Sequence, residues 1–433
     1  MRTITTKERS FDRQCEKGSM NEYTKKSKVT ESVTLPENPD GKTRLSLKRS
    51  FFGRLGSLEN LLPWLDTSID GSFTKILDLS DCSMGDNVVQ GVLIHLLTSN
   101  LGHNLVEIDL SGNCIHASDS GFLLGQLLNR RPSLHCLRLD RNEIDADFVR
   151  ALCHVPDNSL RHISSERTID LYLFGNRLGD EGVSILAESH LGPHFRLLRL
   201  GSNGLQAGSA KGFAKLFTQH RLEHVDLFAN FDIFRGPSDC YNEFRKTLPQ
   251  SNLQHLCLSM CSMSDISLVS SIFLNLPPTL QCLQVNNSLM PYRAYEVLAL
   301  RIAGLPRLHC IALDTWPEDE ALERTWKTAL FSHTVLSMIK INQRPHDPKW
   351  EHFISGICIR NSFIRNIESL LYGPPLRPAV KLLIVERMIS SMNKGLGRSD
   401  KSALFFFVRE CLAHSMNQNV ILYAPVEILQ QPT

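Results

Sequence analysis

The chain has 433 residues, of which 42 % are hydrophobic and 21 % are charged, a composition typical of a globular protein that buries a sizeable core. Its formal net charge of +2 is too small to indicate a nucleic-acid partner or a membrane surface. No run of about eighteen apolar residues predicts a membrane span, and the first twenty residues hold no apolar signal core. Twelve cysteines without a framework spacing then predict reduced thiols in a cytoplasmic protein, with the nucleus as the compartment left open.

The N-terminal fifty residues differ in composition from the rest of the chain. Residues 1–50 carry 12 Lys and Arg against 7 Asp and Glu and are rich in Ser and Thr, which predicts a disordered basic segment. Within it, Gly41-Lys42-Thr43 imitates the end of a phosphate-binding loop. Pro36 stands where that loop needs a glycine, so we expect a solvated linker and no nucleotide site. Residues 51–73 include the apolar stretch LENLLPWL and are predicted to form an N-terminal cap.

A repeating pattern begins at residue 74. In LVEIDLSGNCI, counted from Leu105, apolar residues stand at +3, +5 and +10, and Asn113 stands at +8. Ten copies start at positions 74, 105, 134, 168, 195, 222, 253, 280, 308 and 336, with steps of 27 to 34 residues. Thr168 takes the starting position of the fourth copy, and the last copies lack the Asn. A near-constant period of this length predicts a solenoid, which we place at residues 74–344.

The spacing within each copy predicts a strand, a turn and a helix. Apolar residues at +3 and +5 alternate with polar ones, as on a short strand with one buried face. The turn that follows leaves peptide groups inside the solenoid, and an Asn amide can pair with both kinds of group. We therefore predict an internal ladder of buried asparagine side chains, formed by Asn113, Asn142, Asn176, Asn203 and Asn230. Cys82 and Cys261 occupy the same position in their copies as weaker substitutes. The helical spacing of Val183, Leu186 and Ala187 predicts a helix in the second half of the copy.

The fourth copy, LYLFGNRLGDEGVSILAESHL, resembles a leucine-rich repeat of the ribonuclease-inhibitor type. The resemblance covers about residues 74–344 and implies a curved α/β solenoid with parallel strands on the concave side and helices on the convex side. Residues 345–420 depart from the repeat and read as helices separated by Gly and Pro, which predicts a helical C-terminal cap followed by a tail at 421–433. Such repeats serve inhibitors, receptor modules, ubiquitin-ligase adaptors and GTPase activators alike.

No motif in the sequence predicts a catalytic centre. HExxH, GxSxG and CxxC pairs do not occur. A zinc site is geometrically possible at four side chains of neighbouring copies, His224, His255, Cys257 and Cys282. Surface or packing roles fit these residues better. Asp180 and Glu181 fall at the start of a convex helix, where acids complement the helix dipole. We therefore predict no catalytic residue, no metal and no cofactor.

The exposed face of the strands is the remaining candidate for a binding site. Positions +2, +4, +6 and +7 point into the concavity, and in the third to sixth copies they carry Tyr, Phe and Arg, which are common at protein interfaces. The predicted contact residues are Arg138, Asp140, Tyr172, Phe174, Arg199, Asp226 and Phe228. An ordinary solvated strand surface is the alternative, although exposing three aromatic rings together would be unusual without a partner.

The sequence thus predicts a non-enzymatic scaffold that binds a protein of unknown identity, with no nucleic-acid, membrane or small-molecule partner. Two alternatives come from other uses of the same repeat. A GTPase activator of the Ran-activator type would typically carry a long acidic C-terminal tail, which is missing from the sequence end NVILYAPVEILQQPT. A substrate adaptor of a ubiquitin ligase would need an F-box-like helical segment, for which residues 45–73 leave little room.

Overall fold

A computed structural model describes most of the repeat region and a few short segments on either side of it. The described residues are 43–48, 57–69, 74–99, 101–154, 166–314, 319–341, 353–358 and 361–362. Within them, eleven parallel strands form one sheet whose spatial order equals the chain order. The strands are β1 (Thr43–Ser46), β2 (Thr74–Asp78), β3 (Glu107–Asp109), β4 (Cys136–Arg138), β5 (Ile169–Tyr172), β6 (Phe195–Arg199), β7 (His224–Asp226), β8 (His255–Cys257), β9 (Cys282–Gln284), β10 (Cys310–Leu313) and β11 (Met338–Ile341).

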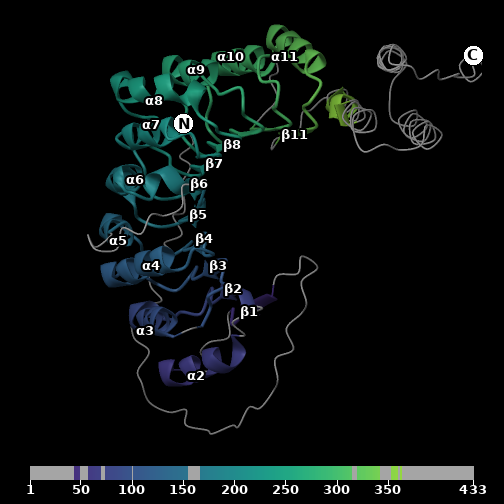
Figure 1. The fold of residues 1–433 in the computed structure, drawn as a ribbon. Helices are drawn as coiled ribbons and strands as arrows, with labels where there is room; N and C mark the ends of the chain where they lie inside the picture. Colours follow the sequence, from purple (N-terminus) through teal and green to yellow (C-terminus); the bar gives the residue numbers. More distant parts are fainter. Residues whose placement is uncertain are drawn as a thin grey trace, which may run out of the picture. The chain divides into compact units, whose positions relative to one another are not determined.

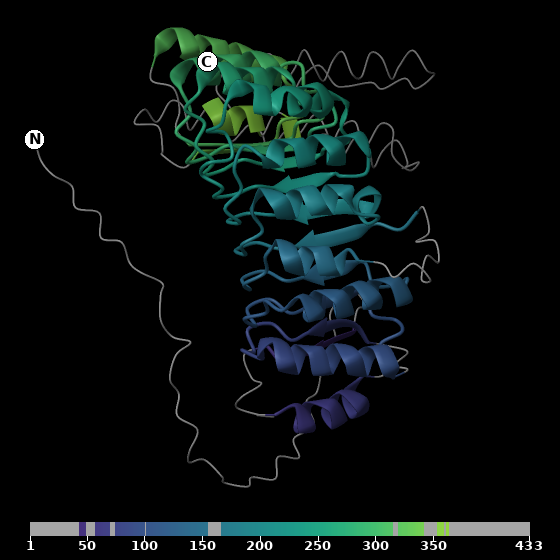
Figure 2. The same cartoon turned by 90° about the vertical axis from the view of Figure 1, so that its left-hand side faces the viewer.

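A helix follows each strand from β1 to β10 and returns the chain to the next strand. The helices are α2 (Leu58–Ser68), α3 (Gly85–Thr98), α4 (Ser118–Arg130), α5 (Ala146–Leu152), α6 (Gly179–Glu188), α7 (Ser209–Thr218), α8 (Asn242–Thr247), α9 (Ile266–Leu274), α10 (Tyr292–Ile302) and α11 (Glu320–Ser332). Short 3-10 turns η2 (Gly192–His194), η3 (Ser238–Tyr241) and η4 (Leu248–Gln250) lie in the connections. Strands line the concave side of this curved solenoid and helices its convex side, which confirms the predicted fold class (Figures 1 and 2).

The core lies between the sheet and the helices and repeats from one unit to the next. Leu171 of β5 is in register with Leu137 of β4 and Leu198 of β6, and all three side chains are buried. On the helix side, Val183 and Leu186 of α6 are also fully buried. Because each unit buries its apolar face only against its neighbours, the core is continuous along the solenoid.

The asparagine amides pair with peptide groups of two successive units. The Nδ2 group of Asn113 donates to the carbonyl oxygens of Leu79 (2.8 Å) and Leu110 (3.0 Å), and its Oδ1 accepts from the peptide N–H of Cys82 (3.1 Å). Equivalent bonds are made by Asn142, Asn176, Asn203 and Asn230. In units without the Asn, a shorter side chain donates to the same kind of carbonyl.

Cys261 Sγ reaches the Leu227 oxygen at 3.2 Å, and Ser288 Oγ reaches the Leu258 oxygen at 2.8 Å. These donors keep the later units regular although the asparagine is missing.

A residue with left-handed backbone conformation lies three positions after the strand in each regular unit. Residues at +7 have φ between 55° and 70°: Asp81, Gly112, Arg141, Gly175, Ser202, Ala229, Met260 and Asn287. For a non-glycine residue this conformation costs about 1–2 kcal/mol. The peptide N–H at +7 gains a bond to the next unit in return, as from Arg141 to the Phe174 oxygen (2.6 Å). The strand thus extends its pairing by one bond before the chain turns into the core.

A second set of side chains holds the C-terminal ends of the helices. Arg131 donates to the carbonyl oxygens of Leu96 (2.8 Å) and Ser99 (3.1 Å) at the end of α3, and Arg167 donates to Leu128 (2.8 Å) in α4. Gln219, Arg301, His333 and Asn361 make comparable bonds in later units. These helix ends are therefore satisfied by the following unit, which couples neighbouring repeats at this edge as well.

The structure corrects two details of the sequence-based expectation. The segment 1–50 was expected to be disordered, but β1 lies inside it and pairs with β2 in parallel. Together with α2, which holds the LENLLPWL stretch, β1 forms a repeat ahead of the ten, where a separate cap was expected. In the fourth copy, Ile169 takes the buried starting position in place of Thr168, because the strand shifts by one residue opposite Phe195.

Several predicted features fall on residues outside the described ranges. These are residues 1–42, including Gly41 and Lys42, and most of the expected C-terminal cap and tail. Of the cap, residues 353–358 form a helix, and Asn361 donates to the His333 carbonyl oxygen at 2.9 Å.

Candidate binding face on the concave side

The predicted contact residues come from two rows of the concave face. Arg138, Tyr172, Arg199 and Asp226 are the +4 residues of β4 to β7, and neighbouring strands place them in direct register. Asp140, Phe174 and Phe228 are +6 residues, just beyond the strand ends. Because side chains alternate along a strand, both rows point away from the core into the concavity.

Arg138 is fixed between an acid and an aromatic ring. Its Nε donates to Glu107 Oε1 at 2.7 Å, and its guanidinium carbon lies 4.1 Å from the centre of the Tyr172 ring. Burial alone lowers the pKa of Arg138, but the hydrogen bond and charge of Glu107 outweigh burial and raise it. The cation therefore stays on the ring at every physiological pH, and the tyrosine is half-buried rather than fully exposed.

Arg199 occupies the centre of the second cluster. Its Nε lies 3.2 Å from Asp226 Oδ2 and its Nη1 lies 3.5 Å from Asp140 Oδ2. Its guanidinium carbon is 5.0 Å from the centre of the Phe174 ring, which in turn lies 6.1 Å from the Phe228 ring. One arginine thus joins residues of β4, β5, β6 and β7 into a single polar and aromatic surface.

The two acids of this cluster also hold the backbone of the aromatic residues. Asp140 Oδ1 accepts from the peptide N–H of Phe174 at 2.7 Å, and Asp226 Oδ1 accepts from that of Phe228 at 2.9 Å. Asp140 is only 9 % exposed, and burial raises its pKa. Its place is therefore beneath the contact surface, where it supports Arg199 and Phe174.

Gly201 makes room for the aromatic pair. It occupies the +6 position of its unit, between Phe174 and Phe228, and a Cβ there would lie 2.7 Å from the Phe174 ring. Sequence reasoning did not single out this glycine or Glu107. The available signal was a glycine at a concave position flanked by phenylalanine in both neighbouring copies.

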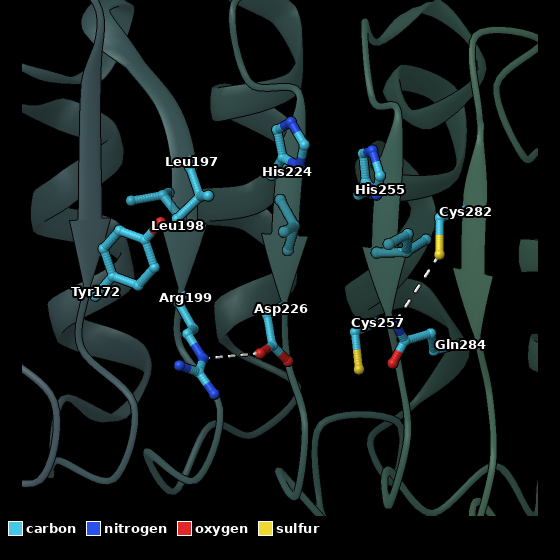
Figure 3. A pocket seen from close by; sticks show the side chains of 12 residues that line it. Tyr172, Leu197, Leu198, Arg199, His224, Asp226, His255, Cys257, Cys282 and Gln284 are labelled. Carbon is cyan, nitrogen blue, oxygen red and sulfur yellow. Dashed lines mark hydrogen bonds and ion pairs between the residues drawn. The ribbon is translucent and has the colours of Figure 1, made fainter. Parts of the chain in front are cut away.

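A pocket of about 210 Å³ adjoins this cluster and extends from Tyr172 to β9 (Figure 3). His224 and His255 line it, and their rings stack with centroids 4.2 Å apart. Burial lowers the pKa of both imidazoles. The charge of Arg196 lowers the pKa of His224 further, and His224 and His309 lower that of His255 further. Both rings therefore favour the neutral form.

The four residues weighed for zinc all line this pocket, yet they do not form a ligand set. Stacked rings keep the in-plane nitrogens of His224 and His255 from converging on one point. Among the described residues, no group of three or more His, Cys, Asp or Glu side chains is placed to hold a metal ion. Burial also raises the pKa of Cys257 to about 12, which favours the thiol over the metal-binding thiolate.

The polar centre of the fourth copy has structural partners. Asp180 and Glu181 lie in the first turn of α6. Asp180 Oδ1 accepts from the peptide N–H of Gln206 at 2.7 Å, and Glu181 forms an ion pair with Arg150. These contacts tie α6 to the units on either side.

None of the helices in the described residues combines the length and the apolar composition of a membrane span.

Comparison with known proteins agrees with this architecture. A leucine-rich-repeat family model matches residues 170–187. Ribonuclease inhibitor of Sus scrofa is 30 % identical over 166 residues, which is 37 % of this chain and 34 % of that protein, so the match spans about a third of the relative.

Similar solved structures include the leucine-rich-repeat-containing protein LegL7 of Legionella pneumophila, with a TM-score of 0.44 and 16 % identity. The match covers 72 % of this chain and 98 % of that one. An internalin of Listeria monocytogenes has a TM-score of 0.37, 15 % identity, and coverage of 66 % and 64 %. Proteins built from such repeats generally mediate protein–protein interactions, and relatives of this type are typically non-enzymatic. The chain is a leucine-rich-repeat protein whose long units, each a strand and a helix, are of the ribonuclease-inhibitor type.

Proposed function

We propose that the chain is a non-enzymatic scaffold that binds a protein partner on the concave face of β4 to β7. The contact surface consists of Arg138, Tyr172, Phe174, Arg199, Asp226 and Phe228, supported from below by Asp140. The observation that carries the proposal is the Arg199 cluster, in which one guanidinium lies 3.2 Å from Asp226 and 5.0 Å from the Phe174 ring centre.

The cluster supports binding because its side chains are already ordered. Immobilising a flexible side chain at an interface costs about 0.5–1.5 kcal/mol. Arg138 and Arg199 are each held by an acid and an aromatic ring, so most of this cost falls on folding and not on association. Arg and Tyr are also the residue types that most often dominate binding energy at protein interfaces.

The relative from Sus scrofa is named for inhibiting a ribonuclease, which is an interaction between proteins. Because the match covers 34 % of that protein, we carry over only the mode of action, binding of a protein, and not its partner.

The test is affinity purification of the full chain from cell extract with quantitative mass spectrometry. We compare the natural chain with a Tyr172→Ala, Arg199→Ala, Phe228→Ala triple variant. At least one protein is expected to be recovered about tenfold less by the triple variant, since each well-placed contact contributes more than about 1 kcal/mol. The reduced recovery is then reproduced with that protein in purified form.

The matched control is Gln284→Ala, which alters an exposed side chain of the same concave face outside the cluster. It is expected to recover the partner as the natural chain does. Circular dichroism and the thermal midpoint of all three proteins show whether the solenoid is intact. Equal recovery by the natural chain and a folded triple variant would refute the proposed surface.

A further inference from the structure

Two cysteines face each other across the last part of the sheet. Cys282 of β9 and Cys310 of β10 are register partners in parallel strands, and both occupy the +2 position on the concave side. Neighbouring strands lie about 4.7–4.9 Å apart, within the Cα separation of about 4.4–6.8 Å that a disulfide spans. The two residues are each 7 % exposed, and Cys282 lines the concave pocket. The pair therefore lies at the wall of the pocket, and each residue keeps a small exposed area.

The two thiols shift each other's pKa values in opposite directions. Hydrogen bonding from the neighbouring Cys282 thiol lowers the pKa of Cys310 to about 7 against the opposing effect of burial. Lys340 on β11 adds a favourable positive charge. The same bond raises the pKa of Cys282, which therefore holds the shared proton. At neutral pH about half of Cys310 is therefore the nucleophilic thiolate, with a thiol beside it.

Other cysteines on the same face have a different environment. Cys136 holds the same +2 position on β4, but burial and the nearby charge of Glu107 raise its pKa. Cys257 on β8 also has a raised pKa, through burial and the charge of Asp226. The contrast makes Cys310 the most reactive of these three thiols, and its register partner Cys282 is placed to resolve it.

We propose that Cys282 and Cys310 form a redox-active dithiol that hydrogen peroxide converts into a disulfide joining β9 to β10. The Cys310 thiolate attacks one peroxide oxygen, the O–O bond breaks, and a sulfenic acid and hydroxide form. The Cys282 sulfur then attacks the sulfenic sulfur, the S–O bond breaks, and the leaving hydroxide takes the Cys282 proton as water. The first hydroxide takes up the proton that Cys310 had released. Two thiols and one peroxide thus give one disulfide and two waters.

The proposal concerns β9 and β10 and does not depend on partner binding at the Arg199 cluster. Oxidation would remove the thiol that Gln284 Nε2 approaches at 3.9 Å and would change the wall of the concave pocket. The site is thus a modification site for a hydroperoxide, and a thiol reductant reverses it.

The test uses the full chain with Cys114 and Cys240 replaced by Ser, which removes the exposed thiols among the described residues. After brief treatment with hydrogen peroxide and quenching with catalase, proteolysis and mass spectrometry are expected to find peptides joined through Cys282 and Cys310, and a reductant is expected to separate them. Before oxidation, iodoacetamide at pH 7 is expected to alkylate Cys310 at least about tenfold faster than Cys257.

Two serine variants separate the proposed steps. Cys282→Ser is expected to leave a sulfenic acid on Cys310 that dimedone traps, whereas Cys310→Ser is expected to leave Cys282 largely unoxidised. Cys136→Ser, at the same strand position on β4, is the matched control and should still form the bond. Failure to form the Cys282–Cys310 link while other cysteines oxidise would overturn the proposal, even if either serine variant failed to fold.

Discussion

At the scale of single residues, the position in the repeat decides what a side chain does. Asn176 and Tyr172 stand four residues apart, yet the amide is buried among peptide groups and the ring lies on the concave face. Acids divide in the same way. Asp180 pairs with a peptide N–H of the next unit, whereas Asp226 faces the concavity beside Arg199. Residue type alone therefore does not distinguish a structural from a binding role in this chain.

The first prediction concerns the asparagine ladder. Asn176→Ala removes bonds to the carbonyl oxygens of Leu139 (3.0 Å) and Leu173 (2.9 Å) and from the N–H of Ile144 (3.0 Å). Each buried group left unpaired costs about 1–3 kcal/mol, so we expect the free energy of unfolding to fall by about 3 kcal/mol. Urea denaturation followed by circular dichroism measures this change.

The matched control for the ladder variant is Asn129→Ala, which changes the same residue type in the convex helix α4. Alanine is a better helix former than asparagine, so this change is expected to be neutral or slightly stabilising. Similar losses in the two variants would show that the Asn176 amide has no special role.

At the scale of single elements, the sequence predicts the order of strands and helices well. The +3 and +5 leucines must face the core, so each strand and its register follow from the pattern. β1 was missed because Lys42 and Ser50 take its starting and asparagine positions. Its Leu45 and Leu47 nevertheless fit the spacing and are buried.

The binding face is less predictable than the strands that carry it. The pattern identifies which residues point into the concavity, but not which of them contact one another. Arg138 lies over Tyr172 because the two strands are in register and Glu107 holds the guanidinium from the other side. Such contacts depend on rotamers and on three strands at once. For the same reason, the burial of Asp140 could not be inferred from its concave position.

The second prediction concerns the stacked histidines of β7 and β8. Burial lowers the pKa values of both His224 and His255 from about 6.5. Arg196 lowers that of His224 further and Asp170 opposes it weakly. His224 and His309 lower that of His255 further and Glu223 opposes it weakly. The unfolded chain therefore binds protons first as pH falls. Their contribution to stability is complete above about pH 6.5 and is lost as pH drops toward the folded pKa values.

We therefore expect the natural chain to lose more stability than His255→Gln between pH 7.5 and pH 5.5. The urea midpoints of both proteins are measured at the two pH values. Subtracting the pH-induced change of His255→Gln from that of the natural chain removes the contribution of all other titrating groups. His116→Gln is the control, because that imidazole is exposed. An identical pH response in the natural chain and His255→Gln would contradict the prediction.

At the scale of the whole repeat region, the sheet, the asparagine ladder and the helix-end bonds join neighbouring units, and side chains on the concave side, such as Arg199 and Asp140, reach across two units. Strands pair in chain order, ladder amides reach one unit back, and helix-end side chains do the same. The free energy of unfolding is then approximately a sum of the stabilities of single repeats and of their interfaces, so a destabilising substitution acts mainly on its own unit and the adjacent ones. At the N-terminal side, α2 packs closely on α3, where a Cβ on Gly91 would lie 2.3 Å from Leu58.

The last prediction follows from this one-dimensional coupling. Leu65→Ala in α2 and Leu198→Ala in β6 each empty a fully buried site and cost about 2–5 kcal/mol. Because the first lies in the outermost described unit, it should accelerate amide hydrogen exchange only in β1, β2 and their helices. The second should accelerate exchange on both sides of β6 while β1 and β10 keep their protection. A uniform rise across all eleven described strands in either variant would instead require that the solenoid unfold as one cooperative body.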